Sequence, residues 1–274
     1  MKTSFKCMLV AAFIGMAGLL SGQQNTLSLG LGGSRIDRQD LIFSPFVQSG
    51  TSASHFDLRW ERKGSRFVQF AGIRYSGFSA SRFNAFQYTT KPDAAVKTTL
   101  PHAFTFVKLE YGLGKTWQSG RFTFSGGGVL ENAVQALNYQ YGESSFFGYF
   151  MAFSLSPRLD ITWPAGKNGR LNAEISFPLL SWVARSPYLV NDDEFIKNAS
   201  SHSGLRTFAE LASDGKLQFP DQLQQLNAGL GYSRQLGARW TAGLHYGFQF
   251  VRHTDPLTLL SYQHDLRIQI GRRF

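Results

Sequence analysis

Apolar and polar residues alternate with a period of two in many stretches of the chain. Because successive side chains of a strand point to opposite faces, this alternation predicts strands with one apolar face. Clear stretches occur near residues 56–60, 103–111, 149–155, 171–177, 226–232 and 240–250, and weaker ones near 25–36, 66–77 and 121–137. The clearest apolar set is Trp240, Ala242, Leu244, Tyr246, Phe248 and Phe250. With a final strand ending at residue 274, the pattern predicts about ten strands, within a range of about 8 to 12.

The predicted connections alternate between short and long. Short links rich in Gly, Lys, Asn or Ser occur at 62–65, 115–120, 165–169 and 236–238, and longer ones at about 37–52, 78–101, 138–146, 185–222 and 252–261. Short turns at one end and long loops at the other are typical of membrane β-barrels, where the short turns face the periplasm. We therefore predict an all-β, antiparallel transmembrane barrel with both termini in the periplasm. The alternative is a soluble β-sandwich or lipocalin-like barrel, in which such an asymmetry is not expected.

The end of the chain, Leu266 to Phe274, also alternates and finishes on an aromatic residue. It resembles the closing strand of bacterial outer-membrane β-barrels, a family in which a terminal Phe is recognised by the barrel-assembly machinery. The resemblance implies that Phe274 is an assembly signal and that this machinery is a partner during biogenesis. It also implies an integral location in the outer membrane of a Gram-negative-type bacterium.

The beginning of the chain is typical of a secretory signal peptide. Lys2 and Lys6 precede a charge-free apolar run from Met8 to Leu20, which is short for a membrane span and is followed by small residues. We predict a signal peptide at 1–22 and a single barrel domain at 23–274. The only cysteine, Cys7, lies in the signal, so disulfides and thiolate chemistry are excluded from the mature domain.

Composition agrees with a barrel. Mean hydropathy is only −0.18, yet aromatic residues make up 15% of the chain and glycine contributes 28 residues. No second apolar run approaches the roughly 20 residues of a spanning helix. Modest hydropathy suits a barrel wall, since only alternate residues face lipid and aromatic residues gather at both interfaces.

The predicted inward faces carry a nearly balanced set of charges, six positive and seven negative. They are Asp57, Arg59, Glu61, Arg74, Lys108, Glu110, Glu131, Arg158, Asp160, Arg170, Glu174, Asp265 and Arg267. A barrel of about ten strands is too narrow for a wide channel. We expect these groups to form a lumen network that plugs the barrel; the alternative is a narrow path for ions or small solutes.

Excess positive charge gathers at the predicted periplasmic rim. Removal of the signal leaves 26 basic residues against 18 acidic ones, a net charge of +8. The rim set is Arg62, Lys63, Arg66, Lys115, Arg121, Lys167, Arg234, Arg239, Arg272 and Arg273. Contact with anionic outer-membrane lipid is the favoured interpretation, and docking of an acidic envelope partner is the alternative. Nucleic acid is not expected as a partner in this compartment.

The longest connection, 185–222, contains two further features. Ser203 and Gly215 bound an amphipathic segment, which predicts a short helix covered by the barrel mouth or by neighbouring loops. Asp192, Asp193 and Glu194 are weak candidates for calcium ligands, but their spacing is not that of a dedicated calcium loop. This loop is also a candidate surface for an envelope protein partner.

Catalysis is the least favoured function. His253 and Asp255 precede one predicted extracellular loop, and His264 and Asp265 follow it, so a His polarised by an Asp at the rim is a weak candidate for a general base. Their surroundings match neither the Ser/His/Asn arrangement of phospholipase barrels nor the Asp/His dyad of rim proteases. No motif predicts a cofactor. We therefore predict a plugged barrel that binds through its loops as part of an envelope assembly, with a narrow pore as the alternative and a rim hydrolase as the third possibility.

Overall fold

The computed structural model describes residues 24–82, 87–89, 96–141, 144–187 and 203–274. Strands dominate this part of the chain, with one described helix. They are β1 (Gln24–Asp40), β2 (Ser44–Lys63), β3 (Phe67–Ala80), β4 (Gln87–Tyr88), β5 (Lys97–Thr98), β6 (His102–Ser119), β7 (Phe122–Tyr141), β8 (Ser144–Pro164), β9 (Gly169–Ser176), β10 (Leu180–Arg185), α3 (Gly204–Ser213), β11 (Lys216–Gln218), β12 (Leu223–Gln235), β13 (Trp240–His253) and β14 (Leu259–Arg273).

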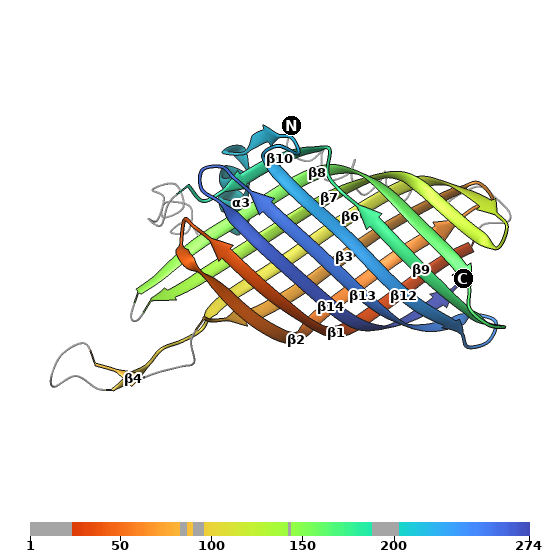
Figure 1. Cartoon of the computed structure of the whole chain (residues 1–274), viewed down its shortest axis with the longest axis horizontal. Helices are drawn as coiled ribbons and strands as arrows, with labels where there is room; N and C mark the ends of the chain where they lie inside the picture. Colours follow the sequence, from red (N-terminus) through yellow and green to blue (C-terminus); the bar gives the residue numbers. More distant parts are fainter. Residues whose placement is uncertain (1–23, 83–86, 90–95, 142–143, 188–202) are drawn as a thin grey trace.

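The main sheet closes into a barrel of ten antiparallel strands (Figure 1). The first and last strands form one seam, in register from Thr26 opposite Arg273 to Asp40 opposite Leu259. β9 and β10 pair with successive parts of β8 and together occupy one position in the wall. β11 pairs with β10 and β12 pairs with β9, so β11 and β12 together occupy the next position in the wall. The fold class predicted from the alternation is confirmed, and the sandwich alternative is wrong because one sheet closes on itself instead of two sheets stacking face to face.

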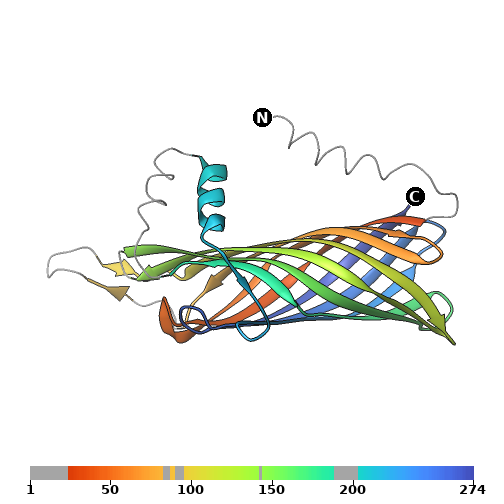
Figure 2. The same cartoon turned by 90° about the horizontal axis from the view of Figure 1, so that it is seen from above.

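The two ends of the barrel differ. We call the end with the turns 64–66, 120–121, 165–168 and 236–239 the short-turn end; Gln24 and Phe274 also lie there. Three of these turns use a glycine with positive φ, Gly120, Gly166 and Gly237, a conformation that costs other residues energy. The opposite, long-loop end carries the small β4–β5 hairpin, which projects beyond the wall, and α3 (Figures 1 and 2). Outer-membrane barrels have short turns on the periplasmic side, so the short-turn end is assigned to the periplasm.

Three connections expected to be long are short in the structure. β1 ends at Asp40 and β2 begins at Ser44, so most of 37–52 is strand; likewise β7 and β8 extend to Tyr141 and Ser144, and only 254–258 separates β13 from β14. The long connections are those between β3 and β6 and between β10 and β12. Among the polar residues that made 37–52 resemble a loop, Arg38, Asp40, Ser44 and Gln48 are buried strand residues at the long-loop end.

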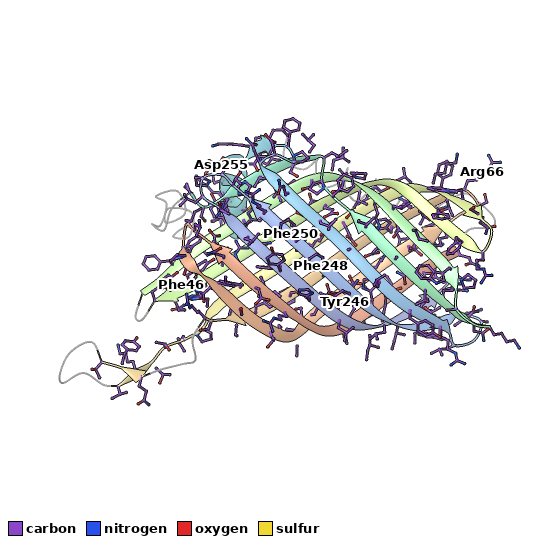
Figure 3. All side chains as sticks on the ribbon, viewed as in Figure 1. Phe46, Arg66, Tyr246, Phe248, Phe250 and Asp255 are labelled. Atoms are coloured by element: carbon purple, nitrogen blue, oxygen red, sulfur yellow. The ribbon has the colours of Figure 1, made fainter. Side chains whose placement is uncertain are left out.

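The outer wall is apolar. On β13 the alternating set points outward, and Tyr246, Phe248 and Phe250 lie one after another along the strand (Figure 3). Exposed leucines and isoleucines of neighbouring strands, such as Leu230 (57% exposed) and Ile268 (64%), continue this surface. The β1–β14 and β8–β9 pairings close the ring of ten strands, and its outer wall is apolar; paired strand edges and a lipid-facing apolar surface are the two requirements for strands in a bilayer. The protein is thus an integral β-barrel of the outer-membrane type.

The lumen is filled near the long-loop end. Each of the ten wall positions contributes a side chain that is at most 6% exposed, and we call this set the plug. Its members are Arg38, Gln48, Phe78, Phe104, Leu137, Phe150, Val183, Leu223, Val251 and Leu259. Most belong to two apolar clusters, one centred on β3, β6 and β7 and the other on β8, β10 and the last strands. Side chains of the wall itself therefore close the barrel at this level.

Helix α3 packs against the outside of the wall. Leu211 joins a cluster with Tyr149 and Met151, which alternate along β8 with plug residues and so face outward. The Trp182 Nε1 atom donates a hydrogen bond of 2.9 Å to the Ala212 carbonyl. The predicted helix is thus present, but the expected cover at the barrel mouth is wrong; Figure 2 shows α3 standing on the outer side. No helix in the described part of the chain is long and apolar enough to cross a bilayer.

Candidate functional site

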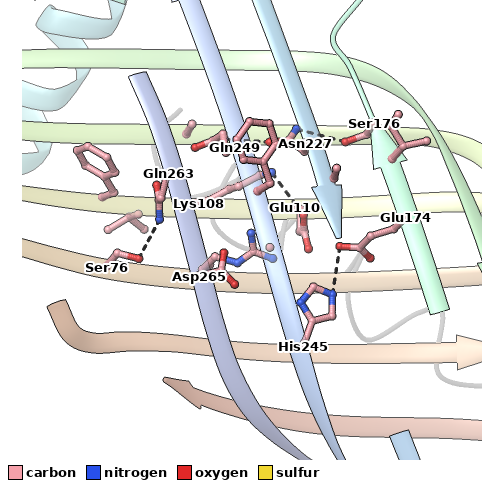
Figure 4. Close-up of a pocket in the computed structure, with 18 of the residues that line it drawn as sticks. Ser76, Lys108, Glu110, Glu174, Ser176, Asn227, His245, Gln249, Gln263 and Asp265 are labelled. Carbon is pink, nitrogen blue, oxygen red and sulfur yellow. Dashed lines mark hydrogen bonds and ion pairs between the residues drawn. The ribbon is translucent and has the colours of Figure 1, made fainter. Parts of the chain in front are cut away.

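Below the plug, towards the short-turn end, the lumen contains two cavities. The central cavity, of about 50 Å³, lies midway along the barrel (Figure 4). The second, which we call the vestibule, has a volume of about 220 Å³ and is lined by residues of the short-turn half, including Gln24, Asn168 and Arg273 near the rim. Glu174 and His245 line both cavities and separate them.

All thirteen charged residues predicted to face inward lie in this part of the lumen. Six line the central cavity: Arg74, Lys108, Glu110, Arg158, Glu174 and Asp265. Glu174 also lines the vestibule, with Asp57, Arg59, Glu61, Asp160, Arg170 and Arg267. Glu131 is 2% exposed and contacts Lys108 in the central cavity. Twelve of the thirteen form ion pairs within the set, and Arg170 forms none with any described residue.

Glu131 is the centre of the first group of contacts. Its carboxylate lies 2.9 Å from the Lys108 ammonium and accepts hydrogen bonds from Ser176 (3.0 Å) and from the Asn227 amide (3.1 Å). The Gln225 amide donates a further bond of 3.3 Å. A buried carboxylate needs this number of partners, because desolvation penalises a charge that lacks them.

Arg158 is the centre of the second group. Its guanidinium forms an ion pair of 2.7 Å with Asp160 and another with Glu174. Glu174 also faces the His245 Nε2 atom at 3.6 Å, and Figure 4 shows this contact between the two cavities. The Phe70 ring lies between two guanidinium groups, with the Arg59 and Arg158 Cζ atoms 4.0 and 4.7 Å from its centroid. Charged and aromatic side chains therefore form a packed layer across the barrel.

A third group connects β2, β3 and β14. Arg74 donates to Asp57 at 3.3 Å, Arg267 donates to Asp265 at 2.7 Å, and the His55 Nε2 atom lies 3.9 Å from Asp265. Arg74 and Asp57 lie on the neighbouring strands β3 and β2, whereas Arg267 and Asp265 lie two residues apart on β14.

Inward glycines make room for this network. A Cβ atom on Gly229 would lie 2.7 Å from the Glu174 side chain and 2.9 Å from the His245 ring, and one on Gly247 would meet the Asp265 carboxylate. Small residues on the inward face of β12 and β13 thus let long charged side chains cross a narrow lumen.

The sequence interpretation missed an ionic cluster within the plug. Asp40 accepts hydrogen bonds from Arg185 (2.6 Å), Arg38 (3.0 Å) and the Ile42 backbone N–H (3.2 Å). Arg38 also donates to Gln135 at 2.7 Å. The available signal was the continued alternation of Ile36, Arg38 and Asp40, which places all three on the inward face.

The four weak catalytic candidates do not meet. His253 is 1% exposed inside the plug, where it contacts Arg185 (3.1 Å) and Gln218 (2.7 Å). Asp255 lies in the connecting loop, 3.4 Å from the exposed Lys216 ammonium. His264 lies on the opposite face of β14 from Asp265, and the Tyr246 hydroxyl is 2.7 Å from its Nδ1 atom. Alternation along β14 separates the last pair, and burial separates His253 from the rim.

The remaining candidates are the possible calcium ligands, the signal peptide and the terminal Phe274. Asp192, Asp193 and Glu194 fall outside the described residues, and the described residues contain no group of three His, Cys, Asp or Glu side chains placed to hold a metal ion. Residues 1–22, the predicted signal peptide, also lie outside them. Phe274 ends the closing strand with 68% of its surface exposed, and its backbone exchanges hydrogen bonds with Asn25. That position leaves its ring accessible to another protein during assembly.

The solved structures to which this chain is similar are outer-membrane β-barrel proteins. No family model and no curated relative matches the chain. Among solved structures, the translocator domain of the autotransporter NalP from Neisseria meningitidis has a TM-score of 0.40 and 12% identity, covering 99% of this chain and 95% of that one. Neisserial surface protein A has a TM-score of 0.38 and 7% identity, with 93% and 98% covered. The toluene transporter TodX of P. putida has a TM-score of 0.33 and 10% identity, with 93% and 90% covered. Likenesses this weak carry no information about what this chain binds.

Proposed function

We propose that the protein is a closed outer-membrane barrel that acts as a binding or structural component of an envelope assembly through its long-loop end. One observation carries the proposal: the plug reaches all ten wall positions, and none of its side chains is more than 6% exposed. A water-filled channel would leave inward side chains accessible along its whole length. With the lumen closed to passage, we assign the contacts with the assembly to surfaces outside the barrel.

The long-loop end offers surfaces suited to this role. The β4–β5 hairpin projects beyond the wall (Figure 1), α3 carries Leu205 (75% exposed), and Phe219 (54% exposed) follows β11. Exposed apolar side chains beside the connection at 185–222 are typical of protein contact sites. They support a partner there in preference to the cationic short-turn end.

Conductance tests the closed lumen. Purified protein is reconstituted into planar bilayers beside a wide porin as a positive control. We expect no stable ohmic steps from this barrel. Regular steps that scale with protein insertion would contradict the plug and favour the alternative of a narrow pore, whose path would pass through both cavities and the Glu174–His245 contact between them.

Photo-crosslinking tests the partner. A crosslinking residue replaces Leu205 on α3, and a matched variant carries it in place of Leu230 on the lipid-facing wall, where 57% exposure gives similar access. One stoichiometric protein adduct from Leu205 that is absent from Leu230 is the expected result. Lipid adducts alone at both positions would refute the assembly role.

A further inference from the structure

The vestibule is a blind polar cavity. The layer of Arg158, Glu174 and His245 closes it from above, and the plug lies beyond that layer. Its open side is the short-turn end, so a molecule that enters from the periplasm leaves by the same route. Such a cavity has the form of a binding site rather than a passage.

Two residues that line this cavity have a buried polar atom without a partner. The Asp57 Oδ1 and Arg267 Nε atoms have no hydrogen-bond partner, although the two residues are only 3% and 4% exposed. They flank Gly30, where a Cβ atom would lie 3.1 Å from the Arg267 Cδ atom and 3.3 Å from the Asp57 Cβ atom. The missing side chain of Gly30 lets the Arg267 and Asp57 side chains pack closely over it. Both unpaired atoms are themselves closed off from solvent, so an occupant of the vestibule contacts the accessible polar groups of its wall.

Cations without partners lie towards the mouth. Arg170 on β9 and Arg273 on β14 both line the vestibule, and neither forms an ion pair or side-chain hydrogen bond with any described residue. The short turns add further arginines and lysines and contain no acidic residue. The four acidic residues that line the vestibule are all engaged in ion pairs, so the uncompensated charge is positive, and such a cleft concentrates anions. The mouth therefore attracts anions.

The vestibule walls bear hydroxyl and amide groups. Thr26, Ser28 and Asn172 line the cavity between the cationic mouth and the buried side chains of Asp57 and Arg267. Such groups exchange hydrogen bonds with hydroxyls of a ligand, while the planar guanidinium donors fit a phosphate by paired N–H contacts.

We propose that the vestibule binds a small hydroxylated phosphate from the periplasmic side. Arg170 and Arg273 hold the phosphate at the mouth, and the ligand hydroxyls reach the polar side chains of Thr26, Ser28 and Asn172. Glycerol 3-phosphate has this chemistry, either as a free molecule or as the headgroup of an inner-leaflet phospholipid.

Calorimetric titration of the full-length mature barrel in phospholipid-free detergent tests the site. Glycerol 3-phosphate is the probe and glycerol the uncharged control. We expect saturable binding of the phosphate alone, weakened about tenfold by Arg170→Gln or Arg273→Gln, since each removes one charge-assisted contact. Arg252→Gln, at the long-loop end, removes the same charge from an exposed side chain and is expected to bind as the unaltered protein does. No saturable binding, or an equal loss in all three variants, would overturn the proposal.

Nanodiscs distinguish the two sources of the phosphate. If the headgroup enters the vestibule, phosphatidylglycerol discs will lower the apparent affinity for free glycerol 3-phosphate relative to phosphatidylcholine discs, and Arg273→Gln will abolish the difference. Equal affinities in the two lipids identify a soluble ligand. Conductance does not enter this test, so a conducting barrel with an intact vestibule site would refute the closed-lumen proposal alone.

Discussion

Substitution of Asp40 by Asn tests how strongly the ionic cluster supports the plug. The carboxylate is 2% exposed and lies between two guanidinium groups, those of Arg38 and Arg185, whose side chains are 1% and 2% exposed. An Asn at this position keeps the shape but removes the charge. It also points amide hydrogens at groups that only donate hydrogen bonds.

The expected loss is large because two buried cations lose their common partner. Removal of one member of a buried ion pair costs about 3–5 kcal/mol, chiefly because the remaining charge is left uncompensated in a medium of low polarity. Contacts of 2.6 and 3.0 Å are both lost or weakened here. We expect Asp40→Asn to lower the free energy of unfolding by at least about 3 kcal/mol.

Guanidinium unfolding of the micelle-refolded barrel, followed by tryptophan fluorescence, measures this loss. Asp255→Asn is the matched control: the same change at the same end breaks the exposed pair with Lys216, whose side chain is 73% accessible. Exposed pairs contribute about 0–1 kcal/mol, so this variant is expected to stay within about 1 kcal/mol of the original. Similar losses in both variants, or a loss below about 1 kcal/mol for Asp40→Asn, would refute the assignment of the cluster as a buried support.

Three further predictions concern packing and assembly. Leu137→Ala in the plug is expected to cost about 2–5 kcal/mol in the same unfolding assay, and lipid-facing Leu230→Ala to cost less because no internal cavity forms; equal losses would count against the plug. Gly247→Ala is expected to destabilise the barrel by about 1–3 kcal/mol through displacement of the Asp265 carboxylate, and an unchanged midpoint would show that the carboxylate moves freely. Phe274→Ala is expected to leave the refolded barrel nearly unchanged in stability but to lower its yield in the outer membrane, measured by cold SDS–PAGE of membrane fractions; an undiminished yield would contradict its role as an assembly signal.

Period-two alternation was sufficient to predict the wall. It placed all thirteen charged residues on the lumen side, because the parity of a strand is fixed once one of its faces is known to be apolar. The closing strand was predicted from the alternating segment that ends at Phe274, and the structure pairs this strand with β1.

The position of polar residues inside a lumen was harder to predict. The predicted loop at 37–52 contained Arg38, Asp40 and Gln48, because charged and polar residues usually face solvent. The local sequence does not reveal that the partner of Asp40 is Arg185, 145 residues away. Helix α3 was predicted from the residues that bound it, Ser203 and Gly215, but the surface of the barrel against which it packs was not predicted. The outward face of β8 that receives it has the same apolar alternation as a face that meets lipid.

Because the plug consists of wall side chains, it has a consequence for the order of folding. Ile36 on β1 and Leu259 on β14 are both 0% exposed, yet more than 200 residues separate them along the chain. Their burial requires the seam to form, and contacts of such sequence separation form slowly. A chain with an open seam therefore presents the apolar plug residues and two unpaired strand edges at once, the combination most prone to aggregation. Pairing of β1 with β14 closes the barrel and removes this hazard in a single step. The chain is therefore most prone to aggregation just before its last strand pairs.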